Sequence, residues 1–433
     1  MKQKTKKINN KNKKSLITNS ESEKERNNKD LNIVRGIILA FSIVFVLGIT
    51  TLIFLYSKGF RIDKKSGEIV SQGLLLLKSV PDGAQIIING EPKTVTNATI
   101  SLKSGTYDIT VKKEGYIEWN KRLTIKDQEV TEATAYLFKN VPSLSAITFT
   151  GISKLFPSKD FTKIAYIIPH GNSPSQNKQT AGIWVMEMTN LPLGFSKDPK
   201  RIADGNFENV TIEWSPDQSE ILVKSGSAAF LLETSSFNPQ EKRINIYSKI
   251  KEVYDNWEKN KKTKENSKLA KVPEEIKQIL LKKSRDFVFS PDEKMVMYIA
   301  SSSATIPSGL LKKLPGSSTQ IESRELSENK TYVYDLTEDK NFLIDEGNEE
   351  TDLGSSPNSK RRLSWFPTSR HIVIADTNNV FIIDYDGTNK KSVYSGIYTA
   401  PHAYPSVGTD RLIILTNLGA SESLPNLYSL SLR

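Results

Sequence analysis

Hydrophobic residues follow three patterns along the chain, and each pattern predicts a different kind of element. Residues 36–57 form one apolar run without a charged side chain. From residue 74 onward, short apolar runs of about five residues alternate with turns rich in Gly, Pro and Asn, which is typical of β-strands. Within residues 240–285 the apolar positions instead recur at helical spacing. The sequence therefore predicts a mainly β protein with one N-terminal apolar helix and a helical insertion.

The apolar run is long enough to cross a lipid bilayer. At about 1.5 Å per residue its helix would extend roughly 33 Å, against a hydrocarbon core of about 30 Å. Within its interior only Ser42, Thr50 and Thr51 interrupt the apolar side chains, so it lacks the polar face of a soluble core helix. No small-x-small cleavage site follows it. We expect residues 33–57 to be a transmembrane signal anchor, in contact with the lipid bilayer through residues 36–57.

The basic residues around this run predict its orientation. Residues 1–30 hold ten Lys or Arg against four Asp or Glu, whereas only four basic residues closely follow the run. The positive-inside bias therefore predicts a single-pass protein of the cell membrane with a cytoplasmic N-terminus and its bulk extracellular or periplasmic. Residues 1–32 are rich in Lys and Asn and lack aromatic residues, so we expect a disordered basic tail. Residues 58–73 are expected to be a juxtamembrane linker or hairpin.

Residues 74–139 carry the turn signals of a small β-sandwich. Pro81 presets φ, Gly83 supplies a positive φ, and Asn89-Gly90 is a strong hairpin signal. The segment resembles the PEGA domain, a small sandwich named for a Pro-x-Gly-Ala tetrapeptide. The residues that carry the resemblance are Pro81, Gly83 and Ala84, Ile88-Asn89-Gly90, Leu102, Gly105, Tyr107 and Gly115-Tyr116. Asp82 replaces the usual Glu, and residues 94–99 replace a Thr-Pro pair. The resemblance implies an extracytoplasmic spacer or binding module without catalytic residues.

A short turn motif recurs through residues 143–433, and a β-rich run follows each copy. Pro fixes φ at such a turn, and a Ser or Asp oxygen can accept a backbone N–H two residues on. Turn geometry therefore explains Asp160, Asp217 and Asp292 better than catalysis does. The five copies are LFPSKD (155–160), EWSPDQ (213–218), FSPDEK (289–294), WFPTSR (365–370) and YPSVGTD (404–410).

This repeat resembles the blades of TolB-like and WD-repeat-like β-propellers, where such a turn joins the inner strand to the next one. The resemblance implies a C-terminal β-propeller at residues 143–433 with at least five blades of about 40 residues. Where successive copies of the motif lie further apart than about 40 residues, we expect insertions, at residues 169–181, 240–285 and 301–329. A strand at 144–150 is expected to pair with the final strand and close the ring.

The insertion at 240–285 predicts two amphipathic helices. Ile246, Ile250, Val253 and Trp257 lie at i, i+4, i+7 and i+11, and Pro273 opens the second helix. The preferred interpretation is a helical hairpin packed on the propeller rim. The insertion also holds fourteen Lys or Arg against seven Asp or Glu. A surface for an acidic polymer or for lipid headgroups is therefore the alternative.

Charge and composition narrow the classes of function. The net charge of +11 is concentrated in the tail and in one insertion, which argues against nucleic-acid binding. The chain has no Cys and three His, and it lacks phosphate-loop, HExxH and GxSxG motifs. We therefore expect no catalytic, cofactor-binding or metal-binding residues and no cofactor.

Two hypotheses of function follow. The preferred one is a membrane-anchored extracytoplasmic binding or scaffold protein of the bacterial cell envelope, whose propeller presents a face to an envelope protein or glycan. The alternative is a propeller-fold hydrolase acting on envelope polysaccharide or peptide. In that case Asp335, Asp376 and Asp384 are the candidate carboxylates. Enzymatic activity is left open, with the non-enzyme favoured.

Overall fold

The computed structural model describes residues 35–57, 60–62, 69–170, 180–188, 198–312, 318–347, 350–354, 359–408, 410–420 and 423–433. The expected disordered tail and much of the expected juxtamembrane segment lie outside these residues. The chain divides into two compact units. The first comprises residues 1–74, 101–104 and 126–129, and the second comprises residues 75–100, 105–125 and 130–433.

The first unit contains the apolar helix, Arg35–Ser57, which is 23 residues long with a mean hydropathy of 2.8. None of its apolar window is buried against the described part of the chain. The hydroxyls of Ser42, Thr50 and Thr51 each donate to the carbonyl four residues earlier, so the helix satisfies its own polar groups. After the helix, β1 (Phe60–Ile62) pairs antiparallel with the start of β2 (Ile69–Val80).

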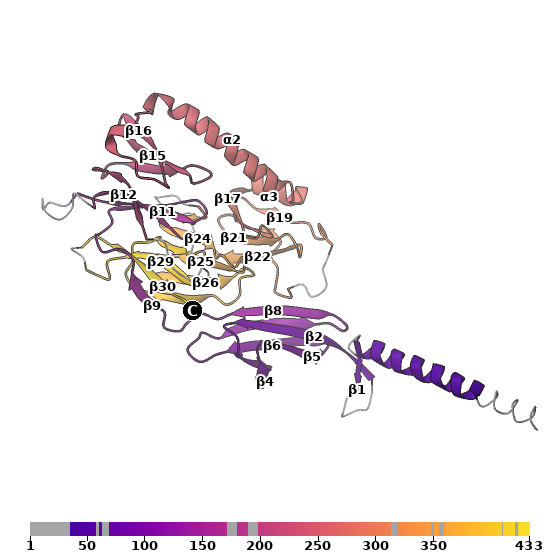
Figure 1. Cartoon of the computed structure of the whole chain (residues 1–433). Coiled ribbons are helices and arrows are strands. Elements are labelled where there is room, and N and C mark those ends of the chain that lie inside the picture. Colours follow the sequence, from indigo (N-terminus) through magenta and orange to yellow (C-terminus); the bar gives the residue numbers. More distant parts are fainter. Residues whose placement is uncertain are drawn as a thin grey trace, which may run out of the picture. The chain divides into compact units, whose positions relative to one another are not determined.

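The small sandwich follows the helix and is built from two sheets (Figure 1). Buried side chains alternate with exposed or half-buried ones along its strands, as expected where one face of each sheet packs on a core. Asn89 and Gly90 have φ of 50° and 82°, which confirms the predicted hairpin turn. One sheet contains β1, β2, β5 (Ala98–Lys103) and β8 (Val130–Tyr136). The other has the order β4 (Glu91–Val95), β3 (Gln85–Ile88), β6 (Gly105–Lys112), β7 (Trp119–Ile125).

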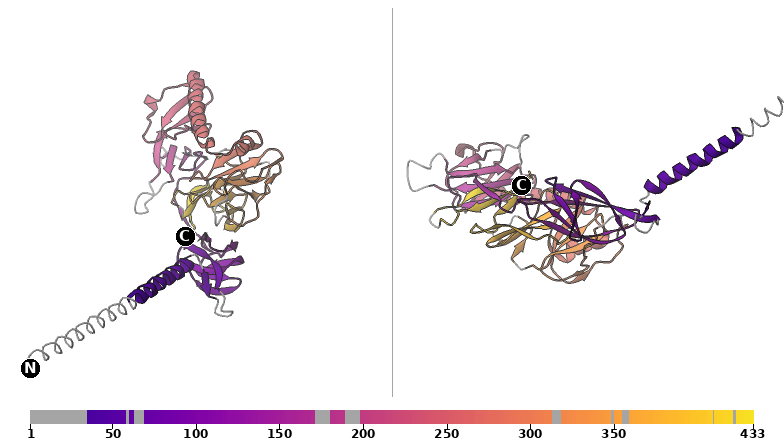
Figure 2. Two further views of the ribbon diagram at one scale, coloured as in Figure 1. Left: turned by 90° about the vertical axis from the view of Figure 1, so that its right-hand side faces the viewer. Right: turned by 90° about the horizontal axis from the view of Figure 1, so that it is seen from below.

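Residues 143–433, hereafter the body, form five larger sheets in chain order where they are described (Figures 1 and 2). The first is β10 (Lys154–Pro157), β11 (Lys163–Ile168), β12 (Gly182–Glu187), β13 (Lys200–Asp204), and the second is β14 (Thr211–Trp214), β15 (Glu220–Ser225), β16 (Ala228–Glu233). The third is β17 (Ser284–Phe289), β18 (Met295–Ala300), β21 (Thr331–Asp335), β22 (Lys340–Asp345). The fourth is β23 (Thr351–Asp352), β24 (Arg361–Trp365), β25 (His371–Ala375), β26 (Asn379–Asp384), β27 (Lys391–Ser395). A small sheet of β19 (Ala304–Thr305) and β20 (Glu325–Leu326) lies within the expected insertion 301–329.

The fifth sheet is formed by both ends of the body. Its order is β28 (Ala403–Pro405), β29 (Arg411–Thr416), β30 (Asn426–Ser431), β9 (Ser143–Ala146). The antiparallel register of β9 and β30 runs from Ser143 opposite Ser431 to Ala146 opposite Tyr428. The expected pairing of an early strand with the final strand is therefore confirmed, although β9 ends at Ala146 and not at residue 150. Beyond the strand, the Thr148 hydroxyl accepts the Leu427 N–H at 2.9 Å.

The recurring motif forms the tight turn that its residues predict. In the third copy, Asp292 Oδ1 accepts the Lys294 N–H at 3.2 Å and the Ser290 hydroxyl at 2.7 Å. The Ser290 hydroxyl in turn accepts the Met295 N–H at 3.0 Å. Asp160 and Asp217 accept the N–H two residues on in the same way. Each of these aspartates therefore stabilises a strand-to-strand turn, which confirms the interpretation from turn geometry.

The insertion at 240–285 contains two short 3₁₀ turns, η1 (Gln240–Lys242) and η2 (Tyr247–Lys249), and two helices. Helix α3 (Glu274–Lys282) begins after Pro273 and buries Ile276, Ile279 and Leu280 against β18 and β21, as expected of a hairpin packed on the body. Helix α2 (Ile250–Leu269) starts four residues later than the apolar spacing predicts and buries only Leu269. The rest of its apolar stripe is only half-buried.

Polar contacts join helix α2 to the motif turns of three different sheets. Its Glu265 pairs with Lys159 at 3.4 Å, and its Lys264 donates to the carbonyl of Pro216. Lys268 pairs with Glu293 at 3.2 Å. These pairs are largely exposed, so each contributes at most about 1 kcal/mol.

Candidate functional site

Strand β7 of the small sandwich carries a charged side chain on an apolar face. Side chains alternate across a strand, so Trp119, Lys121 and Leu123 share one face of β7. Trp119 and Leu123 are buried, and the Lys121 side chain is only 10% exposed. An ammonium group at such a position is stable only with an anionic partner.

Two aspartates from the fourth sheet provide that partner. Lys121 Nζ lies 2.6 Å from Asp386 Oδ2 and 3.6 Å from Asp384 Oδ2, and both carboxylates are buried. The ammonium also lies 5.6 Å from the ring centres of Trp119 and Tyr385, a distance at which cations are attracted to aromatic faces. Burial alone would lower the pKa of Lys121, but the two carboxylates together raise it, so the lysine stays charged.

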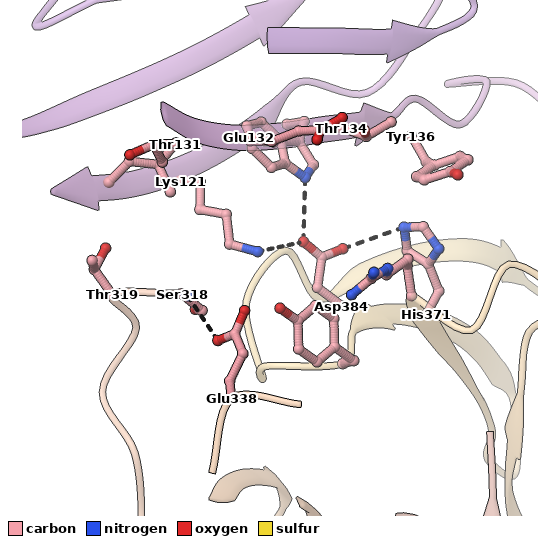
Figure 3. Close-up of a pocket in the computed structure, with 15 residues that line it drawn as sticks. Lys121, Thr131, Glu132, Thr134, Tyr136, Ser318, Thr319, Glu338, His371 and Asp384 are labelled. Carbon is pink, nitrogen blue, oxygen red and sulfur yellow. Dashed lines mark hydrogen bonds and ion pairs between the residues drawn. The ribbon is translucent and has the colours of Figure 1, made fainter. Parts of the chain in front are cut away.

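Asp384 is the centre of this hydrogen-bond network (Figure 3). Its Oδ2 accepts Trp119 Nε1 at 3.2 Å and Asn389 Nδ2 at 3.0 Å. Burial raises the pKa of Asp384 to about 6, with Lys121 opposing this shift and Asp386 adding to it. The network joins the small sandwich to the body inside the second unit through polar groups that satisfy one another.

His371 completes the network on the body side (Figure 3). Its Nε2 lies 3.4 Å from Asp384 Oδ1, and its Nδ1 lies 2.9 Å from the Thr368 hydroxyl. The ring packs edge-on against Tyr136 and Phe138, with centroid distances of 5.0 and 5.3 Å. Burial lowers the pKa of His371 to about 3, so the imidazole is neutral at neutral pH.

A cavity of about 430 Å³ adjoins the network, between strands β7 and β8 and loops of the third and fourth sheets. Figure 3 shows Glu338 and Ser318 on one wall and the threonines of β8 on the opposite wall. The volume lies within the range of about 300–1,000 Å³ that is usual for small-molecule sites. Its lining residues are Trp119, Lys121, Leu123, Thr131, Glu132, Ala133, Thr134, Tyr136, Ser318, Thr319, Glu338, Arg370, His371, Asp384 and Tyr385.

The three candidate carboxylates of the hydrolase hypothesis have separate structural partners. Asp384 lies in the network above, and Asp335 Oδ1 accepts the N–H groups of Thr337 and Glu338. Asp376 Oδ2 accepts Arg361 Nε at 3.1 Å. Asp376 follows β25 and Asp384 ends β26, at opposite ends of one hairpin and therefore roughly 17 Å apart at about 3.3 Å per residue. The structure does not bring these three carboxylates together.

A second buried cation, which the sequence analysis missed, lies on β24. The Arg362 side chain is 1% exposed, and its Nη1 donates to the Tyr404 hydroxyl at 2.9 Å. Its Nε donates to the Gly354 carbonyl at 2.9 Å. The neighbouring Arg361 binds Asp345 through two hydrogen bonds of 2.7 and 2.8 Å. These arginines connect the fourth sheet to its neighbours. In the part of the chain that the structure describes, no three His, Asp or Glu side chains are placed to hold a metal ion.

Two buried histidines predict acid sensitivity. Burial lowers the pKa of His371 and of His402 to about 3, against an ordinary value of about 6.5. Between these values the unfolded chain binds protons that the folded chain does not, so stability falls as pH falls from 6.5 to 3, by about 1.4 kcal/mol per pH unit for each histidine. Asp384, with its pKa raised to about 6, acts in the opposite direction between about pH 4 and 6. Urea unfolding of the full chain from pH 4 to 7 measures the slope.

A matched pair of variants separates this effect from general acid unfolding. We expect His402→Gln to remove about 1.4 kcal/mol per pH unit from the slope below pH 6.5. His170→Gln changes an exposed histidine and serves as the control. An unchanged slope in His402→Gln would show that this imidazole is protonated in the folded protein.

Comparison with known proteins supports part of this architecture. Residues 72–140 match the PEGA domain, so the small sandwich is a PEGA domain, close to the expected bounds 74–139. No curated protein sequence matches the chain. Solved structures with some similarity include putative TolB from Agrobacterium tumefaciens, with 12% identity, a TM-score of 0.22, and coverage of 64% of this chain and 77% of that chain. TolB from Acinetobacter baumannii has 12% identity, a TM-score of 0.21 and coverage of 75% and 60%. A luciferin-regenerating enzyme has 9% identity, a TM-score of 0.26 and coverage of 67% and 95%.

Proposed function

From the PEGA domain at residues 72–140 and the apolar helix ahead of it, we propose that the chain is a membrane-anchored extracytoplasmic binding or scaffold protein of the bacterial cell envelope. The observation that carries this proposal is the apolar helix Arg35–Ser57, none of whose apolar window is buried, ahead of the PEGA domain. The buried contact of Lys121 with Asp384 and Asp386 joins strand β7 of the PEGA domain to the body within the second unit. The strongest polar interactions of the region therefore hold domains together.

The apolar helix supports the anchoring part of the proposal. Its exposed side chains include Phe41, Val44 and Leu52, each more than 60% exposed. In water, this much apolar surface on one helix would be costly, whereas a bilayer accommodates it. The excess of Lys and Arg before the helix favours a cytoplasmic tail, with the PEGA domain and the body on the far side of the membrane.

Two observations support a β-propeller as the fold of the body. In each of the five sheets, one copy of the Pro-containing motif joins a strand to its antiparallel neighbour; in the fourth sheet these strands are β24 and β25. The fifth sheet takes β9 from the start of the body and three strands from its end. Such sharing covers an edge that an open array would expose to other chains. We propose five blades.

The hydrolase alternative receives less support from the described residues. Its three candidate carboxylates, Asp384, Asp376 and Asp335, bind Lys121, Arg361 and backbone N–H groups respectively, so each has a structural partner. A glycosidase pair would lie about 5–10 Å apart and face a common opening. The binding or scaffold function is therefore the one that the geometry supports best.

Protease treatment of cells tests the anchoring and its direction. A full-length chain with epitope tags at both ends is expressed in its own cells, and trypsin is added to intact cells, or to spheroplasts where an outer membrane is present. We expect loss of the C-terminal tag and protection of the N-terminal tag. Detergent-permeabilised cells, in which both tags should be cleaved, are the control. Protection of the C-terminal tag in intact spheroplasts would contradict the proposed location.

A further inference from the structure

Most charges that line the 430 Å³ cavity are already neutralised by the protein. Lys121 is paired with Asp384 and Asp386, and Glu132 is paired with Lys78 at 2.7 Å. The remaining charged side chains are Arg370 and Glu338. The cavity therefore offers one cation and one anion, which disfavours a ligand with a large net charge of either sign.

The uncommitted polar groups gather on the body side of the cavity. Arg370 lies over the Tyr385 ring, with its guanidinium carbon 5.4 Å from the ring centre, and forms no ion pair with the described residues. Glu338 Oε2 accepts the Ser318 N–H at 2.7 Å, and no described group donates to its second oxygen. The Tyr385 side chain is more than nine-tenths buried, and its hydroxyl has no hydrogen-bond partner in the described part of the chain.

Hydroxyl groups and aromatic rings form the opposite wall. Thr131 and Thr134 of β8 line the cavity, and their hydroxyls make no hydrogen bond with described residues (Figure 3). Trp119 and Tyr136 contribute aromatic surface beside them. Tyr385 and Thr131 are more than nine-tenths buried, Glu338 and Thr134 are half-buried, and Arg370 is exposed. These donors and acceptors around one space are therefore available to a polar ligand that enters from solvent.

We propose that this cavity binds a short uncharged glycan. Such a ligand carries many hydroxyl groups that both donate and accept, which matches Arg370 as a donor, Glu338 as an acceptor and the hydroxyls of Tyr385, Thr131 and Thr134 as either. Its ring carbons provide apolar faces for Trp119 and Tyr136. The inference deepens the proposed binding function, on which it rests, by naming a ligand class and a site at the contact of the PEGA domain with the body.

Titration calorimetry on the purified full chain tests this site directly. The protein is kept in a polyoxyethylene detergent, because sugar-based detergents would compete. The probes are chitotriose and maltotriose as uncharged glycans and trigalacturonate as an acidic one. We expect saturable binding of at least one uncharged trisaccharide and weaker binding of trigalacturonate. The proposal would be overturned if neither uncharged probe binds at ligand concentrations up to about the millimolar range, in which weak sites are still detected.

Two conservative variants locate the binding. Tyr385→Phe removes only a hydroxyl, and Arg370→Gln removes a cation without an ion-pair partner among the described residues. We expect each to weaken the affinity about tenfold, as for loss of one hydrogen bond to the ligand, with an unchanged melting temperature. Lys360→Gln, at an exposed lysine paired with Glu350, is the control and should bind as the original chain does. Equal affinity in all three variants would overturn the assignment to this cavity, and so would tighter binding of trigalacturonate.

The outcome is separable from that of the protease experiment. An exported chain that binds no uncharged glycan would overturn the cavity assignment alone. A chain whose body is cytoplasmic but which binds the trisaccharide through Tyr385 would overturn the envelope function and leave the site intact.

Discussion

Lys121→Met should lower the free energy of unfolding by about 3–5 kcal/mol, the usual cost of removing one partner from a buried ion pair. Methionine fills a similar volume, so the loss comes from leaving Asp384 and Asp386 buried without their cation. The two carboxylates would repel each other, and one would take up a proton. Urea unfolding of the full chain at pH 7.5, followed by tryptophan fluorescence, measures the change.

An exposed lysine in the same domain provides the matched control. Lys78 pairs with Glu132 at 2.7 Å, but its side chain is 47% exposed, so Lys78→Met should cost less than about 1 kcal/mol. Adding Asp386→Asn to Lys121→Met removes one of the two buried carboxylates left without a cation. The double variant should therefore recover part of the lost free energy of unfolding. If both lysine variants cost the same, the buried contact does not hold the domains together.

Replacing residues 143–148 with a Gly-Ser segment of equal length should cost roughly 4–8 kcal/mol. The change removes the packing of Leu144 and Ile147 on two core clusters and the bonds of Thr148, and each glycine adds backbone entropy to the unfolded chain. The backbone length is kept, so the PEGA domain stays connected to the body. The unfolding free energy and the protease resistance of the final strand report the result.

The same replacement in an exposed loop distinguishes loss of the shared sheet from a general effect of flexible residues. Residues 307–312 are mostly exposed, and a Gly-Ser segment there should cost about 1–2 kcal/mol or less. An equal loss in the two variants would show that β9 contributes no more to stability than a surface loop does.

The features that the sequence predicted well are those whose causes are local. Asn89-Gly90 forms its hairpin because both residues tolerate positive φ, and Asp217 and Asp292 accept nearby N–H groups wherever the chain turns at those positions. The pairing of β9 with β30 is distant in sequence. It could be predicted by counting strands. The last sheet of the body lacked one strand, and the strand ahead of the first motif copy had no sheet of its own.

The candidate site depends on tertiary contacts and was missed for that reason. One signal was present: Lys121 lies two residues from both Trp119 and Leu123, so strand alternation puts it on their apolar face. The sequence alone does not show which carboxylate pairs with Lys121. Asp384 was singled out, but as a possible catalytic carboxylate, because its partner lies more than 260 residues away in the chain.

The start of helix α2 also differs from the prediction. The helix begins later than its apolar spacing indicates, because residues 247–249 form a 3₁₀ turn.

If the body is exported as proposed, the shared fifth sheet limits when it can fold during translocation. Thr148 and Leu427, which are joined by a hydrogen bond, are 279 positions apart in the chain. A polypeptide that threads through a translocation channel from its N-terminal side can fold its PEGA domain early, but strand β9 must wait for residues 426–431 to emerge. Until then the body keeps an unpaired strand edge, which is open to pairing with other chains.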